Sequence, residues 1–575
     1  MKIEAAALAR LAILVSVAGV ACTGQVGERP VINGGPSTGT GTGGSSGNPP
    51  AGAGNPGSVV IHRLNAFEYD NTINDLLGLS QNMAQKTFIP DEVGPNGFNN
   101  EAGALTISDA EFQQYFNAAD SLAEQLFTDP GLTAKIITCV PASATDAACL
   151  RTIIDGFGPR AYRRPLTTDE VARSVALAAD AIKNGEDFTG SVKQIVKMML
   201  SSLPFLYRIE MDPTPGVGQT HRLSPYELGS RLSYLLWSST PDAKLLAAAQ
   251  SAALLDDAGL VREVDRMLQD PRATNFVSSF AGQWLGMRGL AAHQVESTAF
   301  PTWNESLRQG MVQEVALYFN EFLGGDVPWT QFLTAPVHFV NGPLAQLYGA
   351  TNIPVAQTIM TKVVGLDSRR VGFLGLAAFL TQSSYSYRTV PTLRGKWVYQ
   401  NLLGETIPDP PAGIPPLDPG MGAASNSMTQ DENVRARLLA HRADPTCAAC
   451  HNLLDPIGLG LENFDGIGAY RTTYGNGQSI DASGQFPDGT KFDGSAQLVA
   501  ILSQGVKQTE LVNFAAQQMM TYALGRPLRL AAPNDADRQY LQQIQQQWAK
   551  QGYVFKSLLR DVVLSETFRS RRGGD

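Results

Sequence analysis

Residues 447 to 451 read Cys-Ala-Ala-Cys-His, and this pentapeptide constrains the local fold more than any other part of the sequence. Cys447 and Cys450 are three positions apart, and His451 follows the second cysteine directly. On an α-helix, positions i, i+3 and i+4 lie on one face. We therefore expect a helix here that presents two thiols and one imidazole on the same side.

This pattern is typical of covalent haem c attachment, in which two thiols bond the vinyl groups and the adjacent imidazole binds the iron. The sequence predicts one haem c per chain, bound by Cys447 and Cys450, with His451 as the iron ligand. Three alternatives are weaker. A thioredoxin-like pair would follow a strand, but the polar HRADPT precedes this one. A zinc site would need two more ligands, and a disulfide between the two cysteines would leave His451 without a role.

The second axial ligand of the iron is open. Met519 and Met520 follow His451 at a separation compatible with a small cytochrome fold, and a methionine ligand would raise the reduction potential. The alternative is that NFAAQQMMTYALGRPL forms an amphipathic helix in which a methionine fills core space. His441 is expected on the wrong side of the haem ring. A vacant position would favour catalysis over simple electron transfer.

The N-terminus has the layout of a secretory signal. Lys2 and Arg10 precede an apolar stretch, residues 11 to 20, which ends in small residues. The stretch is too short to be a spanning helix, and no later segment reaches the roughly 18 to 20 apolar residues that a bilayer crossing needs. We expect an extracytoplasmic protein, at the periplasm or cell surface, without a transmembrane span in the mature chain.

The sequence Gly19-Val20-Ala21-Cys22 resembles a bacterial lipoprotein cleavage box, although Gly19 stands where leucine is usual. It predicts a lipidated Cys22 that anchors the chain to a membrane, with plain secretion as the alternative. Residues 23–58 are rich in Gly, Ser, Thr and Pro, and predict a flexible tether.

Helix start signals recur along the rest of the chain. Three capping boxes are visible: Asn65 with Glu68, Thr167 with Glu170, and Ser224 with Glu227. Gly78 is expected to end the first of these helices, and Thr240-Pro241 to open another. Only residues 470 to 495 suggest strands, as one or two hairpins. The predicted class is mainly α: a multi-module helical body followed by a small cytochrome c-like helical domain with a short β-hairpin insertion.

Cys139 and Cys149 flank a short loop, PASATDAA. Because an exported chain matures in an oxidising compartment, we expect these two cysteines to form a disulfide, with two free buried thiols as the alternative.

A chain of 575 residues exceeds what one core usually organises, so several domains are expected. We predict the following division: signal segment 1–22, tether 23–58, N-terminal helical modules 59–205, central helical module 206–350, helical module 351–403, proline-rich connector 404–429 and haem c-binding domain 430–575.

Several segments carry a family resemblance. CAACHNLLDPIGLGLENFDGIGAYR, IDASGQFPDGTKFDG and MTYALGRPL near the C-terminus, and RLNAFEYDNTINDLLG, FGPRAYRRPLTTDEV, LSPYELGSRLSYLLWSSTPDAKLL, HFVNGPLAQLYG and RRVGFLGLAAFLTQSSYSYRTVPTLRGKWVYQNLLG upstream, resemble large secreted bacterial proteins. Those proteins are built from successive domains of unknown function and are known as planctomycete-type cytochromes. The resemblance implies the module order, a mostly helical body and a terminal haem c domain, without a settled substrate. Relatives generally have an apolar residue other than methionine at the position of Met519 and Met520.

A basic cluster precedes the connector. Two of Arg388, Arg394 and Lys396 could neutralise haem propionates through charge-assisted hydrogen bonds. The alternative is a solvated or interface-facing basic patch.

The net charge of −9, without a basic stripe, argues against nucleic acid as a partner. The leading hypothesis is an exported c-type cytochrome that transfers electrons, with a large helical body that docks a redox partner or binds a substrate. The alternatives are a haem-dependent oxidoreductase, either a peroxidase or oxidase or a dehydrogenase subunit, and a cell-surface scaffold or binding protein with a structural haem.

Overall fold

The computed structural model describes residues 61–211, 219–408, 434–533 and 535–573. The predicted signal segment, Cys22, the tether and residues 409–429 of the connector lie outside this part of the chain. Helices account for 59% of the structure and strands for 7%, which confirms the mainly α class.

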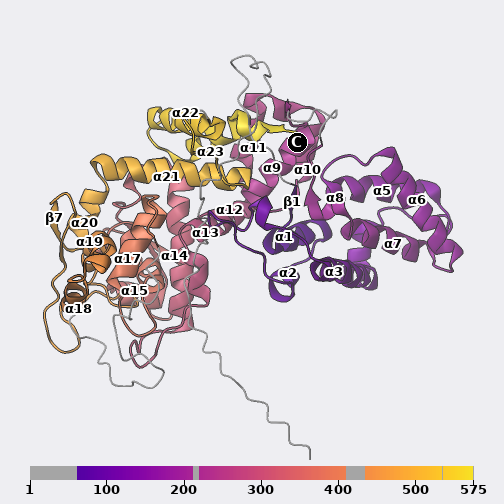
Figure 1. Cartoon of the computed structure of the whole chain (residues 1–575). Coiled ribbons are helices and arrows are strands. Elements are labelled where there is room, and N and C mark those ends of the chain that lie inside the picture. The colour runs from indigo at the N-terminus through magenta and orange to yellow at the C-terminus, as the bar shows by residue number, and fades with distance from the viewer. Residues whose placement is uncertain (1–60, 212–218, 409–433, 534, 574–575) are drawn as a thin grey trace, which may run out of the picture.

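The N-terminal lobe is a helical cluster with its own core, seen at the right of Figure 1. Its buried centre includes Leu122, Ile153 and Val192, each at most 2% exposed. The helices of this lobe are α1 (Ala66–Leu77), α2 (Met83–Thr87), α3 (Asp109–Thr128), α4 (Pro130–Ile136), α5 (Ala147–Tyr162), α6 (Thr168–Lys183), α7 (Phe188–Leu200) and α8 (Leu203–Leu206).

Local start signals are confirmed where a capping box was predicted. The boxes at Asn65, Thr167 and Ser224 each make both reciprocal hydrogen bonds. Gly78 ends α1 in the left-handed conformation, with φ of 70°. The prediction for Thr240-Pro241 is wrong by two residues. The next helix, α10 (Ala243–Gln250), is capped by Asp242, while the Thr240 hydroxyl donates to the Arg160 carbonyl at 2.9 Å.

A second, larger core extends from Phe98 and Leu223 to Phe568 and includes Trp284, Trp329 and Trp548. Its helices are α9 (Pro225–Trp237), α10, α11 (Asp257–Leu268), α12 (Thr274–Phe276), α13 (Gly282–Trp284), α14 (Glu305–Gly324), α15 (Gly342–Tyr348), α16 (Ala377–Gln382), α17 (Pro391–Trp397), α19 (Pro445–Leu459), α20 (Gly494–Leu502), α21 (Gly505–Leu524), α22 (Ala536–Lys550), α23 (Phe555–Leu564) and α24 (Glu566–Arg569). The short α18 (Val434–His441) packs on α19 through its own small apolar cluster.

The parts of the chain on either side of the proline-rich connector share this core. Trp329 lies 5.0 Å from the Phe555 ring, centroid to centroid, and its backbone N–H donates to the Tyr553 carbonyl at 2.8 Å. The C-terminal helix α23 therefore packs against the central helices α11 and α14, and α21 and α22 pack on α23, as Figure 1 shows.

The strands in the described residues form four antiparallel pairs. They are β1 (His62–Arg63) with β2 (Tyr207–Arg208), β3 (Thr220–Arg222) with β8 (Ser570–Arg572), β4 (Val337–Val340) with β5 (Thr361–Val364), and β6 (Ser483–Gln485) with β7 (Lys491–Asp493). The β6–β7 hairpin confirms the insertion predicted between residues 470 and 495.

The disulfide between Cys139 and Cys149 is present, as predicted. It closes a loop in front of α5, with a sequence separation of 10. In the chain-entropy model, a disulfide that closes a loop of this length stabilises the native state by about 2 to 3 kcal/mol.

We therefore expect the double variant Cys139→Ser/Cys149→Ser to lose about 2 to 3 kcal/mol of unfolding free energy for the N-terminal lobe, measured by urea denaturation. Ser143→Ala, an exposed change within the same loop, serves as the control and should shift stability by less than about 0.5 kcal/mol. Equal stability of the two variants would contradict the expectation.

Candidate functional site

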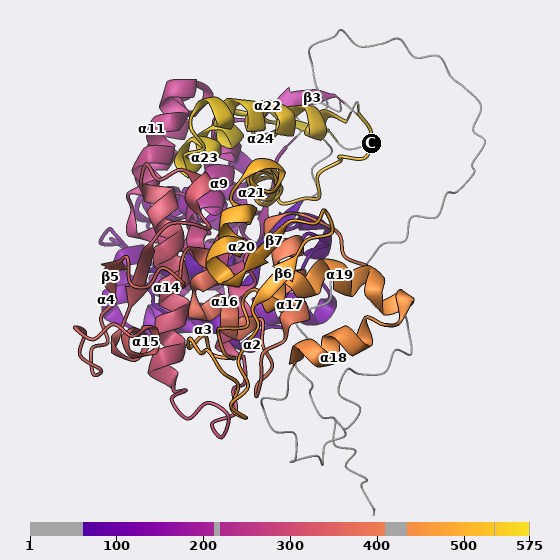
Figure 2. The same ribbon diagram turned by 90° about the vertical axis from the view of Figure 1, so that its left-hand side faces the viewer.

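Helix α19 carries all three residues of the Cys-Ala-Ala-Cys-His motif, as its spacing predicted. The helix begins at Pro445, and the Asp444 carboxylate caps it by accepting from the Thr446 N–H at 2.8 Å. Figure 2 shows α18 and α19 at the periphery of the molecule, close to α17 and the β6–β7 hairpin. The first turns of α19 therefore lie at the surface, whereas its last turns are buried from Leu454 onward.

The two cysteines of the motif are free thiols, and both are partly exposed. Cys450 packs against the edge of the large core. Because Cys447 and Cys450 are one helical turn apart on the face that also holds His451, this surface can offer two sulfur nucleophiles and one imidazole to a single flat ligand.

The imidazole of His451 contacts the carboxylate of Asp455, which lies one helical turn further along α19. Its Nδ1 lies 3.0 and 3.1 Å from the two carboxylate oxygens of Asp455. The Asp455 side chain is fully buried, whereas that of His451 is 19% exposed. The Thr392 hydroxyl on α17 also donates to Asp455, at 2.8 Å. With Nδ1 engaged by a carboxylate, Nε2 of His451 is the nitrogen left to bind a metal.

The ring of His441 lies against that of His451, and the prediction that His441 would stand on the wrong side of a haem ring stays a prediction. The two ring centroids are 4.7 Å apart and the planes are nearly perpendicular, at 71°. His441 ends α18, so the contact depends on how α18 packs on α19.

Met519 and Met520 lie on α21 and are fully buried in the large core. Their side chains fill core space in this structure, and ligation of the iron by either methionine stays a prediction.

The basic cluster before the connector is not a solvated patch, because Arg394 and Arg388 are buried. Arg394 is 0% exposed, and burial lowers the pKa of its guanidinium to about 10. Its Nη1 donates to the carbonyls of Leu461 and Phe464, and its Nη2 to that of Asp465, each at 2.8 Å. Arg394 thus links α17 to the segment that follows α19 by hydrogen bonds. Its guanidinium donors are therefore not available to haem propionates.

Two buried carboxylates were missed by the sequence analysis. Glu462 accepts from the Thr389 hydroxyl at 2.7 Å and from Arg471 at 2.9 Å, and burial raises its pKa. Glu314 accepts from the Tyr348 hydroxyl at 2.6 Å and lies 3.3 Å from Nδ1 of His338. Each carboxylate joins elements that are distant in sequence, so pattern alone carried no signal for it.

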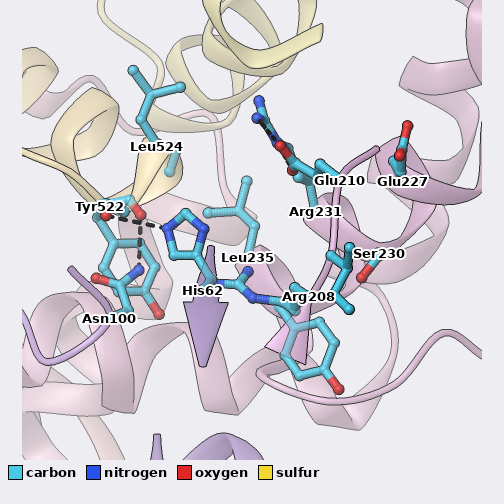
Figure 3. Close-up of a pocket in the computed structure, with 14 residues that line it drawn as sticks. His62, Asn100, Arg208, Glu210, Glu227, Ser230, Arg231, Leu235, Tyr522 and Leu524 are labelled. Carbon is cyan, nitrogen blue, oxygen red and sulfur yellow. Dashed lines mark hydrogen bonds and ion pairs between the residues drawn. The ribbon is translucent and has the colours of Figure 1, made fainter. Parts of the chain in front are cut away.

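A small polar cavity, shown in Figure 3, lies where the N-terminal lobe meets α21. Its volume is about 20 Å³, enough for one water molecule. His62 lines it, with Nε2 3.2 Å from the Gly525 carbonyl, and burial together with nearby Arg208 lowers the pKa of this imidazole well below its usual value. Asn100 donates to the Tyr522 carbonyl at 2.9 Å. The cavity is a joint between modules and is too small for an organic substrate.

A larger cavity of about 560 Å³ borders α19. Pro456 and Leu459 of α19 line it together with three cationic residues, Arg435, Arg442 and Lys491, and one acidic residue, Asp493. Its volume is in the range of ligand sites.

Within the described ranges, no group of three or more His, Cys, Asp or Glu side chains is placed to hold a metal ion. No helix in the same part of the chain is both long enough and apolar enough to cross a bilayer.

Comparison with known families assigns most of the described chain to five domains of unknown function. Residues 62–128 match the profile of Protein of unknown function (DUF1587), 149–210 that of DUF1595, 223–350 that of DUF1592, 370–474 that of DUF1588, and 488–568 that of DUF1585. The DUF1588 match includes α17, α19 and the Cys-Ala-Ala-Cys-His motif, and it crosses the connector. No curated protein and no solved structure matched the chain. The chain is therefore a multi-module protein in which five domains of the planctomycete cytochrome-type families, all of unknown function, follow one another.

Proposed function

We propose that the protein is an exported c-type cytochrome that carries one haem, bound covalently through Cys447 and Cys450 with His451 as iron ligand, and that transfers electrons outside the cytoplasm. One observation carries this proposal. Two free, partly exposed cysteines and an imidazole whose Nδ1 is hydrogen-bonded to Asp455 lie on one face of α19.

The residues present fit a haem c. Both cysteines are partly exposed, and Nε2 of His451 is the ring nitrogen that Asp455 does not engage. The larger cavity borders the last turns of the same helix and is not lined by the three motif residues. When bound, the haem would supply an iron centre that takes up and releases one electron. Cys447 and Cys450 would hold it, and Asp455 and Thr392 would hold the imidazole.

The rest of the chain would fix this site relative to a large body. Because α19 packs on α17 and shares the large core, the site cannot move freely with respect to the central module. This rigidity supports the proposal that the body docks a redox partner close to the attachment helix. Export and attachment to a membrane through Cys22 are proposed from the sequence alone.

The first test is covalent haem content, measured by the pyridine haemochrome assay after expression in a host that attaches haem c. The wild type should contain one covalent haem per chain, Cys450→Ala should show the spectrum of a single thioether bond, and Cys447→Ala/Cys450→Ala should retain none. The matched control is Cys139→Ser/Cys149→Ser, which changes two cysteines far from α19 and should keep the full haem content.

Absence of covalent haem from the wild type would overturn the proposal and favour a scaffold or binding protein. A low-spin, six-coordinate spectrum would support electron transfer. A high-spin spectrum that shifts on addition of cyanide or peroxide would instead indicate an open iron and a haem-dependent oxidoreductase.

A further inference from the structure

We infer that Asp455 is a positioning residue that orients His451 through Nδ1 and thereby lowers the reduction potential of the iron that His451 binds. The inference rests on the proposed function, since it concerns the ligand of the proposed haem. It adds that the reduction potential of the site depends on a buried carboxylate, Asp455, and on Thr392, which lies before the connector in the same DUF1588 domain.

His451 and Asp455 are placed to form a hydrogen bond within α19. Asp455 follows His451 by four positions, so both side chains project from one stripe of α19. The two carboxylate oxygens lie 3.0 and 3.1 Å from Nδ1, and the carboxylate has no exposed surface. A carboxylate in such a place accepts a hydrogen bond from the Nδ1–H group and fixes the tautomer in which Nε2 carries the lone pair.

The carboxylate is itself fixed from another helix. Thr392 lies on α17, and its hydroxyl donates to Oδ1 of Asp455 at 2.8 Å. The α17 and α19 backbones cross in close contact, because Gly395 faces the Leu454 carbonyl and Gly458 faces the Pro391 carbonyl. If the Asp455 side chain turned away from His451, it would lose the hydrogen bond from Thr392 as well as the one from Nδ1.

The charge of this acceptor has a direct chemical consequence. A charged acceptor forms a stronger hydrogen bond than a neutral carbonyl, and it makes the donating imidazole a more basic ligand. A more basic ligand stabilises the oxidised iron, which carries one more positive charge than the reduced iron. The reduction potential should therefore be lower than it would be with a neutral acceptor at the same place.

The test is an optical redox titration of the full-length, haem-loaded protein and of Asp455→Asn, which keeps the shape of the side chain and removes its charge. We expect the ratio of reduced to oxidised protein at a fixed potential to rise about tenfold in the variant, a shift of ~59 mV to more positive potential. Thr392→Val, which leaves the carboxylate in place but removes its anchor, should shift the potential in the same direction by a smaller amount.

The matched control is Asp444→Asn, which removes one negative charge from the same helix. Asp444 is exposed and caps α19, and asparagine caps equally well, so this variant should keep both the helix and the potential of the wild type.

An unchanged potential in Asp455→Asn, or an equal shift in Asp444→Asn, would overturn the inference, because the effect would then not pass through His451. Full covalent haem content in every variant shows that such a failure does not come from the proposed function. Absence of covalent haem from the wild type would overturn both the proposed haem attachment and the proposed role of Asp455. Should Asp455→Asn fail to fold, the potential of Thr392→Val decides: a value equal to that of the wild type overturns the inference.

Discussion

Substitution of Gly458 by alanine will lower the free energy of unfolding by about 3 kcal/mol or more. A Cβ at this position would stand 1.8 Å from the carbonyl oxygen of Pro391 and 2.3 Å from its carbonyl carbon. Both are backbone atoms, so no side chain can turn aside, and α17 and α19 would have to move apart. Alanine is favoured over glycine within a helix by up to about 1 kcal/mol, which does not offset a clash of this size.

Urea denaturation followed by far-UV circular dichroism measures this effect. Gly156→Ala is the matched control, because Gly156 is an exposed position within α5 where a Cβ would meet nothing within 4 Å. It should be neutral or stabilise by up to about 1 kcal/mol. Similar unfolding curves for the two variants would show that α17 and α19 are not in close backbone contact.

Replacement of Arg394 by methionine is the second change for which we expect a large loss, about 3 to 5 kcal/mol. Methionine has a similar length but donates no hydrogen bond, so the carbonyls of Leu461, Phe464 and Asp465 would each lose a charged donor. The Leu461 and Asp465 carbonyls would keep one backbone N–H donor each, whereas the Phe464 carbonyl has only Arg394 among the described hydrogen bonds. Each buried acceptor left without a donor costs about 1 to 3 kcal/mol.

The loss should appear as a lower urea midpoint and as faster proteolysis of the segment after α19. Arg151→Met is the control: Arg151 makes an exposed ion pair with Asp155 one turn away on α5, and pairs of this kind are worth less than about 1 kcal/mol. If Arg394→Met were no less stable than Arg151→Met, the buried guanidinium would not hold that segment in place.

Features that depend on neighbours in the sequence could be predicted. The capping boxes at Asn65, Thr167 and Ser224, the β6–β7 hairpin and the Cys139–Cys149 bridge each involve residues a few positions apart. Such signals need no knowledge of the tertiary structure. The start of α10 was misplaced because Thr240-Pro241 looked like a cap, while Asp242, two residues later, makes the actual bond.

Features that depend on contacts between segments distant in the sequence could not be predicted. The burial of Arg394 and the anchoring of Asp455 by Thr392 both follow from the packing of α17 on α19 across the connector. Two signals were nevertheless present in the sequence. Asp455 lies one helical turn after His451, and a glycine within a helical pattern, such as Gly458, often has a packing reason.

The core shared by the central and C-terminal helices has a consequence for how such chains evolve. If DUF1585 were exchanged or deleted alone, Trp329 would lose Phe555 and the Tyr553 carbonyl together. The boundaries that separate the five domains in sequence are therefore not boundaries at which the protein can be cut. Recombination that separates DUF1592, DUF1588 and DUF1585 should be selected against, so that these three modules are inherited as one set and change their packing residues in concert.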